Sequence, residues 1–109
     1  MKKFKEAHGY AADLQAAYDY YSRYGGATAG RFLAAYLSAL RVIKYHPYVC
    51  RIRMHGWRQM IIKDYPAYSI FYREMESCWL IGGLVGTLQD PDYIQASLLI
   101  REIREPKHD

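Results

Sequence analysis

Residues 59–85, with the sequence QMIIKDYPAYSIFYREMESCWLIGGLV, contain three runs rich in β-branched and aromatic residues. Runs of this kind, separated by short turn-forming segments, are typical of β-strands. The expected strands are Gln59–Lys63, Tyr68–Arg73 and Trp79–Val85. The connecting segments, Asp64–Ala67 and Glu74–Ser77, are short enough for hairpins. We therefore predict a three-stranded antiparallel meander.

The third run, Trp79–Val85, is apolar on both faces of the expected strand. A strand that is buried on both sides needs a covering layer on each face of its sheet. We expect helices from the N-terminal half to cover one face and the C-terminal tail to cover the other.

Two amphipathic helices are expected before the strands, because apolar residues recur there at the spacing i, i+3, i+4, i+7. The first helix runs from about Tyr10 to Tyr24. Its apolar stripe comprises Leu14, Ala17, Tyr18, Tyr21 and Tyr24. The second stripe comprises Phe32, Ala35, Tyr36, Ala39, Leu40 and Ile43. The second helix ends before His46-Pro47, because a residue preceding proline is pushed out of the α region.

Gly25-Gly26 separates the two expected helices and supplies the positive φ of a helix C-cap. Two helices joined by so few residues form an antiparallel hairpin. Alanines at Ala17, Ala35 and Ala39 would let the two backbones approach closely.

Both ends of the chain carry further elements. Asp90-Pro91-Asp92 is a helix-start signal, with a capping acid, a proline at the first helical position and an acid in the first turn. The helix that follows is expected to bury Ile94, Leu98, Leu99 and Ile103, and to end at Pro106. Residues Lys3–Ala7 are a candidate for a short edge strand.

The predicted fold class is thus α+β, with an N-terminal antiparallel helical hairpin packed on a small antiparallel sheet and a C-terminal helix. A chain of 109 residues is of common size for one domain. We expect residues 1–109 to form that single domain.

The stretch from Tyr20 to Lys63 contains eight basic residues and no acid, whereas all eleven acids lie outside it. The eight are Arg23, Arg31, Arg41, Lys44, Arg51, Arg53, Arg58 and Lys63. Unbalanced positive charge concentrates anions, so we expect one basic surface and an acidic partner, either a nucleic acid or a protein. The alternative is that these residues are solvated and scattered over the outer faces of helices and strands.

Cys50 and Cys78 are not part of a CxxC pair or a Cys/His cluster, so we expect no metal site and no cofactor. The charged N-terminus is not followed by an apolar stretch, which favours a reducing, cytoplasmic location. A Cys50–Cys78 disulfide stays open as an alternative. The longest apolar run, Cys78–Val85, is too short to cross a bilayer core of about 30 Å as a helix, so we expect no membrane partner.

An ordered series of segments carries a family resemblance. The series is Ala12-Asp13-Leu14, Ala27–Leu40, Pro47, Gly56-Trp57-Arg58, Tyr68–Arg73 and Asp90-Pro91. Its order and spacing over residues 8–101 resemble the ParE/RelE toxin superfamily of bacterial type II toxin–antitoxin modules, and more closely its ParE branch. The resemblance implies two N-terminal helices packed on a small antiparallel sheet, with a variable C-terminal helix.

For function, the resemblance implies a growth-inhibiting toxin of the plasmid stabilisation type. RelE-like members cleave messenger RNA on the ribosome, whereas ParE-like members lack that catalytic set and inhibit DNA gyrase. The segment Gly86–Gln89, where the nucleases usually place an Arg or a His, has no titratable group here. We expect a non-enzymatic gyrase inhibitor. An mRNA endoribonuclease is the first alternative, and a non-toxic nucleic-acid or protein binding module is the second.

A ribonuclease needs a base, an acid and a charge stabiliser within hydrogen-bond reach of one phosphate. The candidates are Arg51, Arg53, His55, Arg58, Lys63, Arg73 and Tyr93. His55 precedes Gly56 and also suits a turn, and Arg58 could instead pair with Glu74 or Glu76. Tyr72 and Arg73 point to opposite faces of a strand, so they cannot serve one site together.

By resemblance, the partner is a cognate antitoxin whose acidic and apolar C-terminal segment wraps the toxin. The expected antitoxin-binding residues are Tyr18, Tyr21, Arg41 and Lys44. The expected target-binding residues are Arg51, Arg53, Arg58 and Lys63. The target is DNA gyrase, or the ribosome and its mRNA in the alternative. A homodimer and a toxin–antitoxin heterotetramer are both compatible with the sequence.

Overall fold

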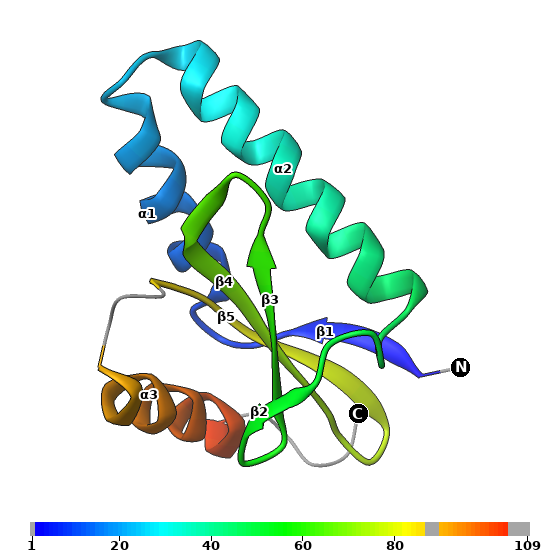
Figure 1. Ribbon diagram of the computed structural model, residues 1–109. Coiled ribbons are helices and arrows are strands. Elements are labelled where there is room, and N and C mark those ends of the chain that lie inside the picture. Colours follow the sequence, from blue (N-terminus) through cyan, green and yellow to red (C-terminus); the bar gives the residue numbers. More distant parts are fainter. Residues whose placement is uncertain (1, 87–89, 105–109) are drawn as a thin grey trace.

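The computed structural model describes residues 2–86 and 90–104 (Figure 1). Its elements are β1 (Lys3–Glu6), α1 (Tyr10–Ser22), α2 (Gly26–Tyr45), β2 (Ile52–Met54), β3 (Trp57–Ile62), β4 (Tyr65–Glu74), β5 (Cys78–Gly86) and α3 (Pro91–Arg104). The strands form one sheet in the order β1-β5-β4-β3-β2. β1 is parallel to β5, and the other neighbouring pairs are antiparallel. The fold is α+β as predicted, but the sheet is mixed and has five strands instead of three.

The predicted meander corresponds to β3, β4 and β5, which pair in sequence. Its first turn is tighter than expected, since Ile62 pairs with Tyr65 and only Lys63 and Asp64 lie between them. Asp64 adopts a φ of 70°, a left-handed conformation that aspartate tolerates better than most residues. β4 therefore begins at Tyr65, and the predicted four-residue loop is wrong.

The two outer strands differ in how well the sequence indicated them. β1 forms at the expected edge, where Phe4 pairs with Trp79 of β5. β2 was not predicted, because its three residues, Ile52–Met54, are too few for their alternation to be distinguished from a loop. It is held as a strand by pairing with β3, a contact that no local pattern reveals.

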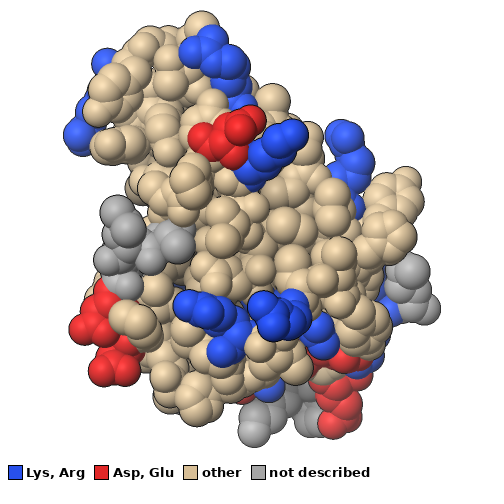
Figure 2. All heavy atoms as spheres, viewed as in Figure 1, with Lys and Arg blue, Asp and Glu red and all other residues tan. Residues whose placement is uncertain are grey.

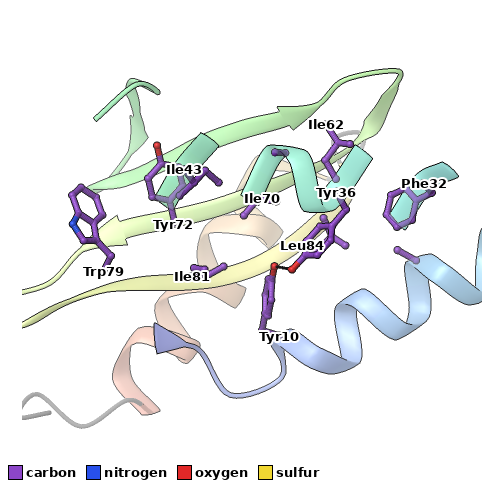
Figure 3. Packing of buried hydrophobic residues seen from close by; sticks show 12 residues of the cluster. Tyr10, Phe32, Tyr36, Ile43, Ile62, Ile70, Tyr72, Trp79, Ile81 and Leu84 are labelled. Atoms are coloured by element: carbon purple, nitrogen blue, oxygen red, sulfur yellow. Dashed lines mark hydrogen bonds between the residues drawn. The ribbon is translucent and has the colours of Figure 1, made fainter. Parts of the chain in front are cut away.

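Helices α1 and α2 cover one face of the sheet and α3 covers the other (Figure 1). β5 lies between these layers, and its residues 78–84 are all buried. The cluster under α1 and α2 includes Phe32, Tyr36, Ile43, Ile70, Tyr72, Trp79 and Ile81 (Figure 3). The cluster under α3 comprises Ala7, Trp57, Phe71, Leu80, Ile94 and Leu98. The expectation that both faces of this strand are covered is confirmed.

Helices α1 and α2 run in opposite directions (Figure 1). Ala17 of α1 and Ala39 of α2 are buried in the cluster that these helices cover. The hydroxyl groups of Tyr10 and Tyr36 form a hydrogen bond inside this layer (Figure 3). Burial raises the pKa of both phenols. The two polar groups thus satisfy each other in an apolar surrounding, where an unpaired hydroxyl would be costly.

The turn between the helices differs in detail from the prediction. α1 ends at Ser22, so Tyr24 lies outside the helix and is exposed instead of contributing to the apolar stripe. Gly25 has the predicted positive φ, 113°, but it is the N-cap of α2, and the C-cap of α1 is Arg23 in the right-handed helical region. Gly26, in contrast, is already the first residue of α2.

α3 begins at the predicted signal, with the backbone N–H of Asp92 donating to Asp90 Oδ1 at 2.9 Å. Ile94 and Leu98 are buried as expected, whereas Leu99 is exposed and does not belong to the packed stripe. The side chain of Ile103, and Pro106, lie outside the described residues.

Within the described residues, no helix combines the length and the apolar character needed to span a bilayer. Cys50 and Cys78 are both in the thiol form, and no disulfide joins them.

Candidate functional site

The eight basic residues of the acid-free stretch do not form one surface, so that prediction is wrong. Arg23 and Arg31 lie near the turn between the helices, and Arg41 and Lys44 lie near the end of α2. Arg51 precedes β2, Arg53 lies on β2, Arg58 lies on β3, and Lys63 lies in the turn after β3. On the face drawn in Figure 2, Lys and Arg side chains form separate groups, one of them a row across the lower part of the sheet. The folded chain therefore distributes the cations over several patches.

One patch surrounds a shallow depression of about 410 Å³ at the β2 edge of the sheet. It is lined by Arg51, Ile52, Arg53, Gln59 and Ile61. The two isoleucines are 57% and 52% exposed, and no acid lines the depression. We refer to it as the β2 depression. It combines two exposed guanidinium groups with apolar surface, as protein interfaces often do.

Arg58 does not join Arg51 and Arg53 in this depression. Its Nη1 donates to the backbone oxygen of Cys50 at 2.6 Å, and its guanidinium lies over the rings of Tyr48 and Trp79. The alternative partner proposed for Arg58 was Glu74 or Glu76, but within residues 2–86 and 90–104 no ion pair joins Arg58 to either acid. Arg58 is engaged by a carbonyl and two rings on the helical-hairpin face of β3.

Lys63, the remaining expected target-binding residue, is exposed in the β3–β4 turn beside Asp64. It does not line the β2 depression. Of the four residues predicted to bind a target, the structure brings together only Arg51 and Arg53.

The candidate nuclease residues are dispersed as well. His55 has a φ of 46° and forms, with Gly56, the turn between β2 and β3. Arg73 lies on the α3 face, where its Nη1 bonds Glu102 at 2.7 Å and the His55 carbonyl at 2.9 Å. Tyr93 is exposed on α3. Arg73 and Tyr72 lie on opposite faces as predicted, since Tyr72 packs under α1 and α2.

Among the described residues, no group of three or more His, Cys, Asp or Glu side chains is placed to hold a metal ion. Residues 87–89 of the segment Gly86–Gln89 lie outside the described residues.

A second hollow, a groove of about 430 Å³ with a mainly apolar lining, lies along α1. It is lined by Glu6, Tyr10, Ala11, Leu14, Gln15, Tyr18 and Leu33, and we call it the α1 groove. Tyr18, predicted to bind an antitoxin, is therefore part of an open apolar surface.

Tyr21, the other tyrosine predicted for this role, is used mainly for packing. Its ring centroid lies 4.7 Å from that of Phe32, 5.2 Å from that of Tyr65 and 5.9 Å from that of Tyr68. It joins α1 to the β3–β4 hairpin, and it does not line the α1 groove.

Arg41 and Lys44 are exposed on α2, on the stripe that continues the groove wall. Leu33, Leu37 and Arg41 are spaced by four residues and Lys44 follows three residues later, so all four lie on one side of the helix. Leu37 is 47% exposed. The apolar wall of the α1 groove therefore leads along α2 to two cations.

A third cluster, which the sequence analysis missed, joins α1 to α3. Asp13 accepts a bidentate hydrogen bond from Arg101, whose Nη2 lies 3.0 Å from Asp13 Oδ1. Arg101 also donates to the carbonyl of Gly82 at 2.8 Å, and its hydrogen bonds to the Asp13 carboxylate raise the pKa of Arg101. One signal was present, since Asp13 interrupts the inward stripe of Tyr10, Leu14 and Ala17. An acid on a buried helix face requires a partner.

No family model matches the chain, and no curated protein matches its sequence. Among solved structures, a chain of the chromosomal ParDE TA system from P. aeruginosa is similar in fold, with a TM-score of 0.68. The match covers 79% of this chain and 96% of that chain, at 20% sequence identity. At this identity the similarity establishes a shared fold.

Proposed function

We propose that this chain, which has the fold of the ParE/RelE toxin superfamily, is the toxin of a bacterial type II toxin–antitoxin pair. In this proposal it acts in the cytoplasm, inhibits DNA gyrase by binding, and is neutralised by a cognate antitoxin. The observation that carries the proposal is the mainly apolar α1 groove, whose wall leads along α2 toward Arg41 and Lys44, on a fold shared with a ParDE system. A plasmid stabilisation role would follow from such a pair.

The α1 groove has the chemistry to accept an amphipathic, acidic antitoxin segment. Leu14, Tyr18 and Leu33 offer apolar surface for the apolar side chains of such a segment. Arg41 and Lys44, further along α2, would attract its acids and set its direction. An antitoxin that is disordered when unbound could fold along this path and gain both kinds of contact.

Dispersal of the candidate catalytic residues supports binding as the mode of action. Arg58 is held beneath Tyr48, Arg73 is paired with Glu102, and Tyr93 lies on a different element. General acid–base cleavage would require such groups around one phosphate. The β2 depression, with Arg51 and Arg53 exposed beside two isoleucines, suits contact with an acidic protein surface.

Expression of the chain in a bacterial host tests the activity. Gyrase inhibition should arrest growth with filamentous cells and an induced DNA damage response, and the purified chain should inhibit supercoiling by purified gyrase. Rapid loss of transcripts would instead indicate the endoribonuclease. Unimpaired growth would contradict a toxin of either kind.

The target surface is tested by replacing Arg51 and Arg53 together with alanine. Each charge-assisted hydrogen bond to a partner contributes about 1.5–3 kcal/mol, so gyrase inhibition should weaken by at least about tenfold. Arg31→Ala is the matched control, because Arg31 is exposed on α2 and does not line the β2 depression. Equal inhibition by the double variant and the control would remove the β2 depression from the target site.

The antitoxin surface is tested with the product of a small gene adjacent to this one, if that product has an acidic C-terminal half. Tyr18→Ala, and separately Arg41→Glu with Lys44→Glu, should each raise its dissociation constant by at least about tenfold in titration calorimetry. Arg23→Glu with Arg31→Glu, near the turn between the helices, is the charge-matched control for the double reversal. An unchanged dissociation constant in both groove variants would place the antitoxin elsewhere.

A further inference from the structure

Residues 46–51, between α2 and β2, are neither helix nor strand, yet side chains of the sheet and of the segment itself fix them at three points. The three hydrogen bonds are Tyr72 Oη to the Pro47 carbonyl at 2.8 Å, Tyr48 Oη to Glu74 Oε2 at 2.8 Å, and Arg58 Nη1 to the Cys50 carbonyl at 2.6 Å. This segment leads directly into Arg51 and Arg53. The hydrogen bonds that fix this segment therefore also fix the position of Arg51, which lines the β2 depression.

Arg58 is the central group of this arrangement. Its guanidinium carbon lies 5.2 Å from the ring centroid of Tyr48 and 6.0 Å from that of Trp79. The two rings meet edge to face at 5.1 Å and 75°. The guanidinium thus makes cation–π contacts with two rings and donates a hydrogen bond to a carbonyl. These contacts hold residues 48–50 against β3 and β5.

Glu74 supports the arrangement from the side. It bonds Lys2 Nζ at 2.9 Å and the Tyr48 hydroxyl at 2.8 Å. These two bonds, from Lys2 first and Tyr48 second, lower the pKa of Glu74. The carboxylate therefore keeps the exposed ring of Tyr48 in place over Arg58.

β2 depends on this support because its own pairing is short. Only Ile52 with Arg58 and Met54 with Trp57 are in register with β3, and the ladder is irregular between them. Arg58 thus contacts both neighbours of Arg51, holding Cys50 through its side chain and Ile52 through strand pairing. Arg51 lies between two fixed residues.

We propose that Arg58 is a positioning residue, which fixes residues 46–51 and thereby the orientation of Arg51, just before β2, and of Arg53, on β2. In this proposal Arg58 does not itself contact the target. The role of Arg51 and Arg53 as target contacts rests on the proposed function. Their like charges repel, so a mobile segment would let them spread apart. Holding them in one arrangement before binding reduces the entropy lost on association.

Substitutions at Arg58 and Tyr48 test this inference through two separate readouts, growth inhibition and amide hydrogen exchange over residues 48–54. Arg58→Met removes the charge, whereas Arg58→Lys keeps the charge but loses the planar guanidinium that contacts both rings and the Cys50 carbonyl. Both should speed exchange and weaken growth inhibition by about tenfold. Tyr48→Ala should do the same although it removes no charge, and Tyr48→Phe, which keeps the ring, should change both much less.

The double variant Tyr48→Ala with Arg58→Met should lose no more growth inhibition than the single variant that loses more of it. The reason is that both substitutions break the same set of contacts. Arg31→Met is the control for loss of an exposed arginine, and urea unfolding of each variant identifies any that fail to fold. If Arg58→Met weakens growth inhibition with unchanged exchange, or if Tyr48→Ala inhibits fully, Arg58 contacts the target and the inference is wrong.

The two proposals can fail separately. If the wild-type chain does not inhibit growth, the proposed function is wrong, but the exchange measurements still decide whether Arg58 fixes the segment. Unchanged exchange in both Arg58→Met and Tyr48→Ala would overturn the positioning role even if the chain is toxic.

Discussion

Gly82 is the residue at which β5 makes room for the α3 layer. The β4–β5 register places Phe71 opposite Gly83 and Tyr72 opposite Ile81, which leaves Gly82 as an extra residue in the strand. A Cβ at Gly82 would lie 2.4 Å from Trp57 Cζ3 and 3.1 Å from Leu98 Cδ2. The absent side chain lets the Trp57 ring pack directly against the backbone of β5.

Gly82→Ala should lower the free energy of unfolding by about 1–3 kcal/mol, because a packed indole ring must shift to admit the methyl group. Urea unfolding measures the change. Gly30→Ala is the matched control, since a Cβ at that position of α2 would meet no atom within 4 Å other than the adjacent residues and the backbone of its own helix. The control should gain about 0.5–1 kcal/mol, because alanine is favoured over glycine inside a helix. Equal stabilities of the two variants would contradict the close packing at Gly82.

At the scale of elements, the described side chains of α3 attach it to the rest of the molecule by apolar contacts and by two ion pairs. Its residues Ile94 and Leu98 pack against the sheet. Its residue Glu102 bonds Arg73, and its residue Arg101 bonds Asp13 of α1. The Arg101–Asp13 pair joins residues that are 88 positions apart. It ties both helical layers to β5, since Asp13 also accepts from the Leu84 N–H at 3.2 Å.

Arg101→Met should destabilise the chain by about 2 kcal/mol, because it removes both guanidinium hydrogen bonds from the partly buried Asp13 carboxylate and leaves it only the Leu84 N–H. Hydrogen exchange of the α3 amides should speed up more than that of β4. Gln15→Ala, which removes an exposed hydrogen bond to Asp19, should change stability by less than about 0.5 kcal/mol. Unaltered protection of α3 in the Arg101 variant would mean that its apolar contacts alone hold the helix.

At the scale of the whole molecule, β5 belongs to both apolar clusters, with Ile81 in one and Leu80 in the other. Each cluster also contains one of the two tryptophans, Trp79 under α1 and α2 and Trp57 under α3. Loss of either layer would expose a face of the same strand. The two layers should therefore unfold together.

Variants with a single tryptophan, Trp57→Phe and Trp79→Phe, should each show one urea transition by fluorescence that coincides with the loss of circular dichroism. The substitutions themselves should lower stability, so each variant is compared with its own circular dichroism curve. Two separate midpoints within one variant would show that the α3 layer unfolds independently.

The elements with regular local patterns were predictable from the sequence. Both N-terminal helices, the three meander strands and the start of α3 follow from a 3.6-residue or two-residue repeat and from cap residues, which act over a few positions. The same holds for the His55-Gly56 turn. The errors at Tyr24, Asp64 and Leu99 lie at element ends or on an exposed helix side, where the repeat is weakest.

The sequence by itself therefore determined which segments are helical or extended, except for β2, and that the last strand is covered on both faces. Only the tertiary structure decided which side chains meet: Arg51 beside Arg53, Arg58 beneath Tyr48, and Asp13 against Arg101. The physical reason is that hydrophobic repeats are properties of neighbouring residues, whereas the position of a charged group depends on strand pairing and layer packing between distant segments. Eight cations in one stretch of sequence can thus occupy separate surfaces in the folded chain.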